Sequence, residues 1–163
     1  MPKLSVYANL KKGKSKKHKL LKQVGAIVYR RSETGIKILI ITSRASGRWI
    51  LPKGWPMPKK SDQEAARIEA WEEAGVKRIK NEPKRCGSLR YDKNLQSGIS
   101  VPIDLHLYSI EATKLTKNFP ERGQRNMRWV RINTAIRKLE QPELKKILKR
   151  LNHEVSKKVW SKH

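Results

Sequence analysis

Hydrophobic positions in the first half of the chain form three short runs that predict β-strands. Residues 23–29 and 36–41 are dense in β-branched side chains, which favour buried strands. The Ser-Glu-Thr-Gly stretch at 32–35, between these two runs, has the composition of a turn. Residues 49–51 predict a third, shorter strand, which Pro52 should end because proline cannot donate a ladder hydrogen bond.

A polar segment then predicts the start of a helix. Ser61 stands three residues before Glu64, the spacing of a capping box in which each side chain bonds the other residue's amide. Residues 65–71 continue with good helix formers, and Gly75 suits the left-handed conformation that ends many helices. The sequence therefore predicts one helix from about residue 62 to residue 74.

The second half of the chain predicts further strands followed by helices. Residues 86–91 and 128–130 read as short strands, and residues 101–110 alternate apolar and polar positions with period two. Near the C-terminus, apolar residues recur at three- and four-residue spacing and form one helical stripe: Leu144, Ile147, Leu148, Leu151 and Val155. Strands and helices are mixed without regular βαβ alternation, so we expect an α/β or α+β sandwich forming one domain.

Charge adds a second feature to this picture. The 163 residues include 39 basic and 14 acidic ones, for a formal net charge of +25. Such a charge attracts polyanions, and phosphate is the group that it favours most. Residues 11–19 hold six lysines in nine positions, so residues 1–19 are predicted to be a basic, mobile arm preceding a domain at 20–163. The arm could contact nucleic acid or be only a solvated tail.

The cellular compartment is predicted from what the chain contains. Cys86 is the one cysteine, so no internal disulfide can form, which favours a reducing compartment. No apolar run approaches the roughly 20 residues of a membrane span, and the N-terminus lacks the apolar core of a secretory signal. We expect a cytoplasmic protein without a membrane partner.

Three carboxylates in the predicted helix point to chemistry. Glu69, Glu72 and Glu73 stand at i, i+3 and i+4, so they share one face of the helix. Negative charges this close destabilise a helix on its own, and a hard divalent cation with oxygen ligands would compensate for them. An exposed acidic face whose charge is balanced by nearby lysines is the simpler alternative.

The sequence around these carboxylates resembles the Nudix box. Residues 54–76 read GWPMPKKSDQEAARIEAWEEAGV, which matches the length of the box without a gap. The family's conserved residue types stand at Gly54, Glu69, Glu72, Glu73, Gly75 and Val76. The flanking residues 48–53 and 55–56 also resemble Nudix hydrolases of the diphosphoinositol-polyphosphate and dinucleoside-polyphosphate type. The resemblance implies an α/β/α sandwich with a mixed central sheet.

The chain departs from the box at three places. Lys60 stands where the box has its first glutamate, Ile68 stands where it has arginine, and Ala70 is small for an aliphatic position. Arg67 is one place early, and on a helical wheel it points about 100° away from position 68. These departures leave a catalytically weakened binding module on the same fold as an alternative.

The resemblance also implies roles for the acidic residues. Glu69, Glu72 and Glu73 would hold Mg²⁺ or Mn²⁺ together with the main-chain carbonyl of Lys53, since both ions suit all-oxygen ligation. A further catalytic base often lies on a loop outside the box, and Glu121 is the candidate. An ordinary surface role for Glu121 is equally compatible with the sequence.

Basic residues near the box are the candidates for holding the rest of the substrate. Forked guanidinium groups suit phosphate, and the candidate set is Arg44, Arg48, Lys53, Arg122 and Arg125. The predicted function is a metal-dependent pyrophosphohydrolase acting on a small, highly phosphorylated or nucleoside-diphosphate-linked substrate. Cleavage at the 5′ end of RNA, with the basic arm as a tether, is the alternative reaction.

Overall fold

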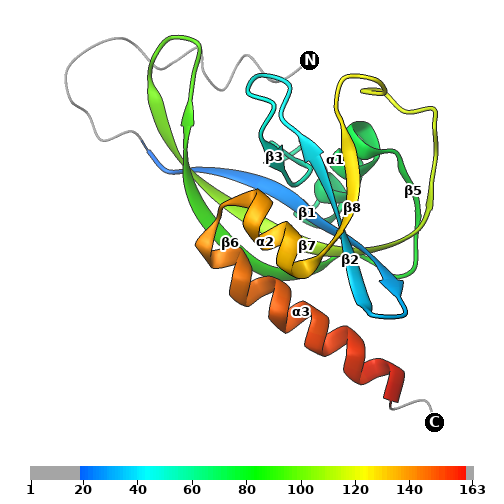
Figure 1. The fold of residues 1–163 in the computed structure, drawn as a ribbon. Helices are drawn as coiled ribbons and strands as arrows, with labels where there is room; N and C mark the ends of the chain where they lie inside the picture. The colour runs from blue at the N-terminus through cyan, green and yellow to red at the C-terminus, as the bar shows by residue number, and fades with distance from the viewer. Residues whose placement is uncertain (1–18, 161–163) are drawn as a thin grey trace.

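The computed structural model describes residues 19–160, with side chains described to residue 157. Three helices flank a central sheet of eight strands (Figure 1). No helix in this part of the chain is long and apolar enough to cross a membrane. The predicted basic arm at residues 1–19 falls almost wholly outside the described residues.

The strands of the sheet follow the order β3-β2-β1-β7-β5, with β4 paired to β1, β6 to β7 and β8 to β2. β1 and β7 run parallel over nine residue pairs, and every other pairing is antiparallel. The sheet is therefore mixed, as the Nudix resemblance implied. The strands are β1 (Leu21–Ser32), β2 (Gly35–Thr42), β3 (Trp49–Ile50), β4 (Lys53–Gly54), β5 (Val76–Ile79), β6 (Lys84–Asn94), β7 (Ser100–Leu115) and β8 (Met127–Arg131).

Two hydrophobic clusters lie on the two faces of the sheet. Side chains alternate along β1, so that Ala26 and Val28 join one cluster while Ile27 and Tyr29 join the other. The first cluster packs against α1 (Asp62–Ala74). The second packs against α2 (Ile132–Leu139) and α3 (Pro142–Trp160), which lie on the opposite side of the sheet in Figure 1. The predicted three-layer sandwich is confirmed.

Helix α1 begins and ends where the sequence predicts. Ser61 and Glu64 form both bonds of the capping box, at 3.1 and 2.8 Å. The helix ends at Gly75, which has a φ of 70°. A Cβ at Gly75 would lie 2.5 Å from the carbonyl oxygen of Thr116 and 2.7 Å from the ring of Phe119. Gly75 therefore serves the helix end and also the close approach of the loop that follows β7.

The strand predicted at residues 49–51 ends before Pro52, as the sequence indicated, because β3 covers Trp49 and Ile50. The sequence did not predict β4, which follows Pro52 and pairs with Val24 and Gly25 of β1. Proline lacks the amide hydrogen but keeps its carbonyl, which here accepts a hydrogen bond from the amide of Ala26 at 2.9 Å. Pro52 thus bonds β1 as an acceptor between β3 and β4, and the loop at residues 55–61 then leads to α1.

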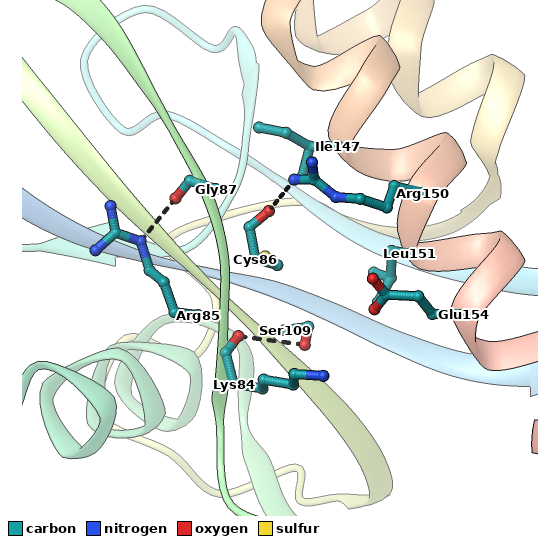
Figure 2. A pocket seen from close by; sticks show the side chains of 9 residues that line it. All are labelled: Lys84, Arg85, Cys86, Gly87, Ser109, Ile147, Arg150, Leu151 and Glu154. Atoms are coloured by element: carbon teal, nitrogen blue, oxygen red, sulfur yellow. Dashed lines mark hydrogen bonds between the residues drawn. The ribbon is translucent and has the colours of Figure 1, made fainter.

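The long helix α3 packs against strand β6, and residues of both line a small pocket (Figure 2). The guanidinium of Arg150 donates to the carbonyl of Cys86 at 2.7 Å. The next residue, Gly87, has a φ of 153°, and a Cβ there would lie 2.8 Å from Cδ1 of Ile147. This close contact places the Cys86 side chain inside the junction, where burial raises the pKa of its thiol from 9.0 to about 12.

We expect Cys86 to be nearly inert towards alkylating reagents in the folded protein. With a pKa of about 12, the thiolate fraction at pH 8 is on the order of 10⁻⁴, and the thiolate is the reactive form. Because the thiol ionises near its ordinary pKa in the unfolded chain, its contribution to stability is complete below about pH 9 and is lost as the pH rises towards 12. Iodoacetamide kinetics at pH 8 measure this reactivity, and equal rates for native and denatured protein would contradict it.

Candidate functional site

The acidic face of α1 points into the protein rather than to solvent. Glu69 is 1% exposed and Glu73 is 4% exposed, whereas Glu72 is only partly buried. Buried carboxylates are rare unless they are paired or bind a cation. The simpler reading of this helix as a solvated acidic face is therefore wrong for Glu69 and Glu73.

The carboxylate of Glu69 lies directly against the backbone of Gly54. A Cβ at position 54 would lie 1.9 Å from Oε1 and 2.2 Å from Cδ of Glu69. No side chain can occupy that space, and β4 holds Gly54 in place by pairing it with Val24 of β1. The glycine therefore opens a cradle in which the carboxylate meets main-chain atoms.

Glu73 is held by one main-chain group and one side chain. The amide of Lys53 donates to Oε2 of Glu73 at 3.2 Å, and Nη2 of Arg125 donates to Oε1 at 3.3 Å. The Arg125 side chain is 7% exposed and also donates to the carbonyl of Thr42 at 3.0 Å. Arg125 is thus fixed between the end of β2 and the acidic face of α1.

Glu121 reaches the same cluster from the loop between β7 and β8. Its amide donates to the carbonyl of Glu72 at 3.0 Å, which ties the loop to the C-terminal turn of α1. Its carboxylate pairs with Arg44 at 3.1 Å and with Arg125 at 3.6 Å. The sequence placed Glu121 near the site by resemblance alone, and the structure brings it beside Glu73.

A cleft of about 1000 Å³ opens beside this cluster. Among the residues predicted from the sequence, Glu73 and four of the basic candidates line it: Arg44, Arg48, Lys53 and Arg125. Arg122 is exposed and does not line the cleft. The structure therefore brings together four of the five predicted phosphate-binding residues and leaves Arg122 apart.

Other residues that line the cleft were not predicted as site residues. Tyr91, Lys93, Trp55 and Lys138 of α2 also line it. The hydroxyl of Tyr91 donates to the buried side chain of Gln23, which fixes the ring beneath the ammonium group of Lys53 at 4.0 Å. Nothing in the local sequence marks Tyr91 and Lys93, because they reach the cleft only through the pairing of β6 with β7.

The environment of Lys53 combines burial with several charges. Burial, the largest cause, together with the charge of Lys93 lowers the pKa of Lys53 from 10.5 to about 8, and the charge of Glu73 opposes this shift. The side chain lies over Tyr91, while the main chain of the same residue contacts Glu73. Lys53 therefore links the acidic cluster to the basic and aromatic wall of the cleft.

The sequence matches the NUDIX domain over residues 19–151, which is most of the chain. The chain belongs to the Nudix family. It is thereby placed among hydrolases that act on acid anhydrides in phosphorus-containing compounds. The resemblance noted at residues 54–76 is confirmed by a match that covers the whole sandwich.

Solved Nudix structures have the same fold. A binary complex of the Caenorhabditis elegans Ap4A hydrolase is 22% identical, with a TM-score of 0.61 over 84% of this chain and 98% of that one. A Nudix hydrolase of Listeria monocytogenes is 19% identical, with a TM-score of 0.61 over 83% and 94%. The NUDIX domain of Shewanella oneidensis NrtR, solved with ADP ribose, is 11% identical, with a TM-score of 0.59 over 81% and 88%. No curated protein matches the sequence.

The site fits a hard divalent cation, which the Nudix family generally uses. Two buried carboxylates and the Lys53–Gly54 backbone provide oxygen donors only, and the space at Gly54 admits the Glu69 carboxylate. Among the residues whose side chains the structure describes, no group of three or more His, Cys, Asp and Glu is arranged to hold a metal ion. A cation here would therefore rely on two buried carboxylates completed by main-chain oxygen and water.

Proposed function

We propose that this chain is a divalent-metal-dependent pyrophosphohydrolase that cleaves a phosphoanhydride bond in a small, highly phosphorylated or nucleoside-diphosphate-linked substrate. The observation that supports this most directly is the pairing of opposite charges in one cleft. The buried carboxylate of Glu73 and four basic residues, Arg44, Arg48, Lys53 and Arg125, line the same cleft, and Glu69 is buried on the same helix face as Glu73. Carboxylates attract the metal and arginines attract phosphate, so a metal–polyphosphate complex satisfies both.

In this proposal Glu69 and Glu73 hold Mg²⁺ or Mn²⁺ together with the Lys53 carbonyl, and Glu72 contributes through water. When bound, the cation polarises the phosphoryl group and lowers the pKa of an attacking water. Arg44 and Arg48 hold the phosphate chain, because both line the cleft and are exposed, and Arg44 can exchange its pairing with Glu121 for an anion.

Glu121 remains the candidate for the general base. It shares Arg125 with Glu73, so its carboxylate lies beside the proposed metal site. A base must stand within hydrogen-bond reach of the water that it deprotonates, and the loop bond to Glu72 holds Glu121 at that edge of the cluster. Arg44, its second partner, would turn towards substrate phosphate when the cleft is filled.

The size and lining of the cleft favour a substrate with a planar group beside its phosphates. A volume of about 1000 Å³ is at the upper end of small-molecule sites. Trp49, Trp55 and Tyr91 line the cleft, and aromatic faces can stack on a nucleobase. Two solved relatives, the Ap4A hydrolase and the NrtR domain with ADP ribose, are associated with such compounds.

A substrate panel in Mg²⁺ and in Mn²⁺ tests the proposal. It should contain a dinucleoside polyphosphate, ADP-ribose, a diphosphoinositol polyphosphate and RNA with a 5′ pyrophosphate bond. We expect hydrolysis of at least one of the three small compounds, abolished by EDTA and restored by metal. Reaction in ¹⁸O-labelled water should place the label on a phosphate product, because the attack occurs at phosphorus.

The panel also separates the alternatives. Phosphomonoesters of matched charge serve as the control, because they lack the anhydride and should not be hydrolysed. Turnover of the RNA alone would contradict the small-molecule proposal. Binding of the small compounds without turnover in either metal would contradict hydrolysis and favour the binding-module alternative raised by Lys60 and Ile68.

A further inference from the structure

The acidic face of α1 lacks the arginine that the Nudix box normally places on this helix. Ile68, an apolar and partly buried residue, stands at the box arginine position, and the last turn of α1 carries no basic residue. Glu72 and Glu73 lie in that turn, where the negative end of the helix dipole opposes carboxylates. The missing positive charge must therefore come from outside the helix.

Arg125 is the group that supplies it. Its Nη2 contacts the carboxylates of Glu73 and Glu121 at 3.3 and 3.6 Å, so two elements of the fold converge on one nitrogen. Its side chain is 7% exposed, against 52% for Arg44, the other arginine that pairs with Glu121. A guanidinium this deeply buried is held by its partners and has little freedom to follow a substrate.

The backbone around Arg125 is fixed as firmly as its side chain. Asn126 and Thr42 exchange two hydrogen bonds: the Thr42 amide donates to the Asn126 carbonyl at 3.0 Å, and the Asn126 amide donates to Thr42 Oγ1 at 2.9 Å. Nη1 of Arg125 donates to the carbonyl of the same threonine at 3.0 Å. The end of β2 thus sets the position of the guanidinium before any ligand enters.

We propose that Arg125 is a positioning residue, which holds Glu73 and Glu121 in register and supplies the counter-charge that Ile68 cannot provide. This differs from the substrate-binding role that the sequence suggested for Arg125. The expected effect of Arg125 on turnover rests on the proposed function. The expected coupling of Arg125 and Glu73 in stability does not. Removing Arg125 leaves two carboxylates of like charge near one another without their shared partner.

The first test is kinetic and uses the panel substrate that turns over. We expect Arg125→Gln to lower kcat about 10- to 100-fold, as is typical when support for a metal ligand is lost, with KM changed less than about threefold. Arg125→Lys keeps the charge without the fork, so its kcat should lie between those of Arg125→Gln and the wild type. Arg78→Gln, at an exposed arginine of β5, is the matched control and should leave both constants unchanged. A raised KM with unchanged kcat in Arg125→Gln would overturn the proposal and assign Arg125 to substrate binding.

The second test needs no activity and survives failure of the proposed function. Thermal unfolding is compared for Arg125→Gln, Glu73→Gln and the double variant without metal. Since Arg125→Gln removes the buried positive charge that Glu73 shares with Glu121, and Glu73→Gln then removes the charge left facing it, we expect the double variant to melt above Arg125→Gln, so that the two losses in Tm are not additive. Additive losses would show that the two side chains are not coupled, and would overturn the proposal even if hydrolysis is observed. If nothing in the panel is hydrolysed, the same comparison of Tm values still tests whether Arg125 and Glu73 are coupled.

Discussion

Glu73→Gln is expected to lower the turnover number by about a hundredfold to a thousandfold, the usual cost of removing one preorganised electrostatic contact. The substitution takes a negative charge from a side chain that is 4% exposed and contacts both Lys53 and Arg125. It preserves the shape of the side chain, and its amide oxygen can still accept from the Lys53 main chain. The fold should therefore persist, as judged by circular dichroism and a single unfolding transition.

The matched control for this variant is Glu82→Gln, which removes the same charge from an exposed residue between β5 and β6. The control should turn over at the wild-type rate. Rates are compared at saturating Mg²⁺, so that weaker metal binding is separated from lost chemistry. A wild-type rate for Glu73→Gln under these conditions would remove Glu73 from the proposed metal site.

Gly54→Ala is expected to have the second large effect, by steric displacement. The added Cβ would lie 1.9 Å from a carboxylate oxygen of Glu69, so the carboxylate or the β4 backbone must move. Overpacking of this kind costs about 1–3 kcal/mol of stability, and a shift of about 1 Å in a catalytic group can cost on the order of a hundredfold in rate. We expect a lower Tm and a loss of most activity.

Gly98→Ala is the control for the backbone cost of replacing a glycine. Gly98 lies between β6 and β7 with a φ of 78°, and a Cβ there would meet nothing within 4 Å. Its replacement should cost about 1–2 kcal/mol through the left-handed backbone alone, with kcat unchanged. Retention of full activity by Gly54→Ala would show that the Glu69 carboxylate is not needed where the structure places it.

The cleft combines the positive charge of the chain with a buried negative side chain. The formal net charge is +25, yet the cleft is lined by the buried carboxylate of Glu73, which shares Arg125 with Glu121. A buried carboxylate in a basic protein attracts a cation at short distance, while the net charge attracts a polyanion over long distance. Both attractions act on the same compound when phosphate and metal arrive as a complex.

The sequence by itself determined the family and most of the elements, although not the short strands β4 and β5. The capping box at Ser61, the glycine at position 75 and the spacing of Glu69 and Glu73 depend on local backbone geometry, which neighbouring residues fix. Alternation along residues 101–110 predicted a strand for the same reason, and β7 extends beyond it because its neighbours in the sheet continue the ladder. The roles assigned to the metal-site residues remain predictions.

Only the tertiary structure decided how distant segments meet. The carbonyl of Pro52 accepts a hydrogen bond from the amide of Ala26 on β1, and Tyr91 reaches the cleft because β6 pairs with β7. Arg125 stands 52 residues from Glu73 in sequence, and its guanidinium is buried because the end of β2 and the β7–β8 loop close around it. Such contacts depend on strand register and layer packing, which span the chain, and a local pattern carries no information about which distant side chain will fill a given space.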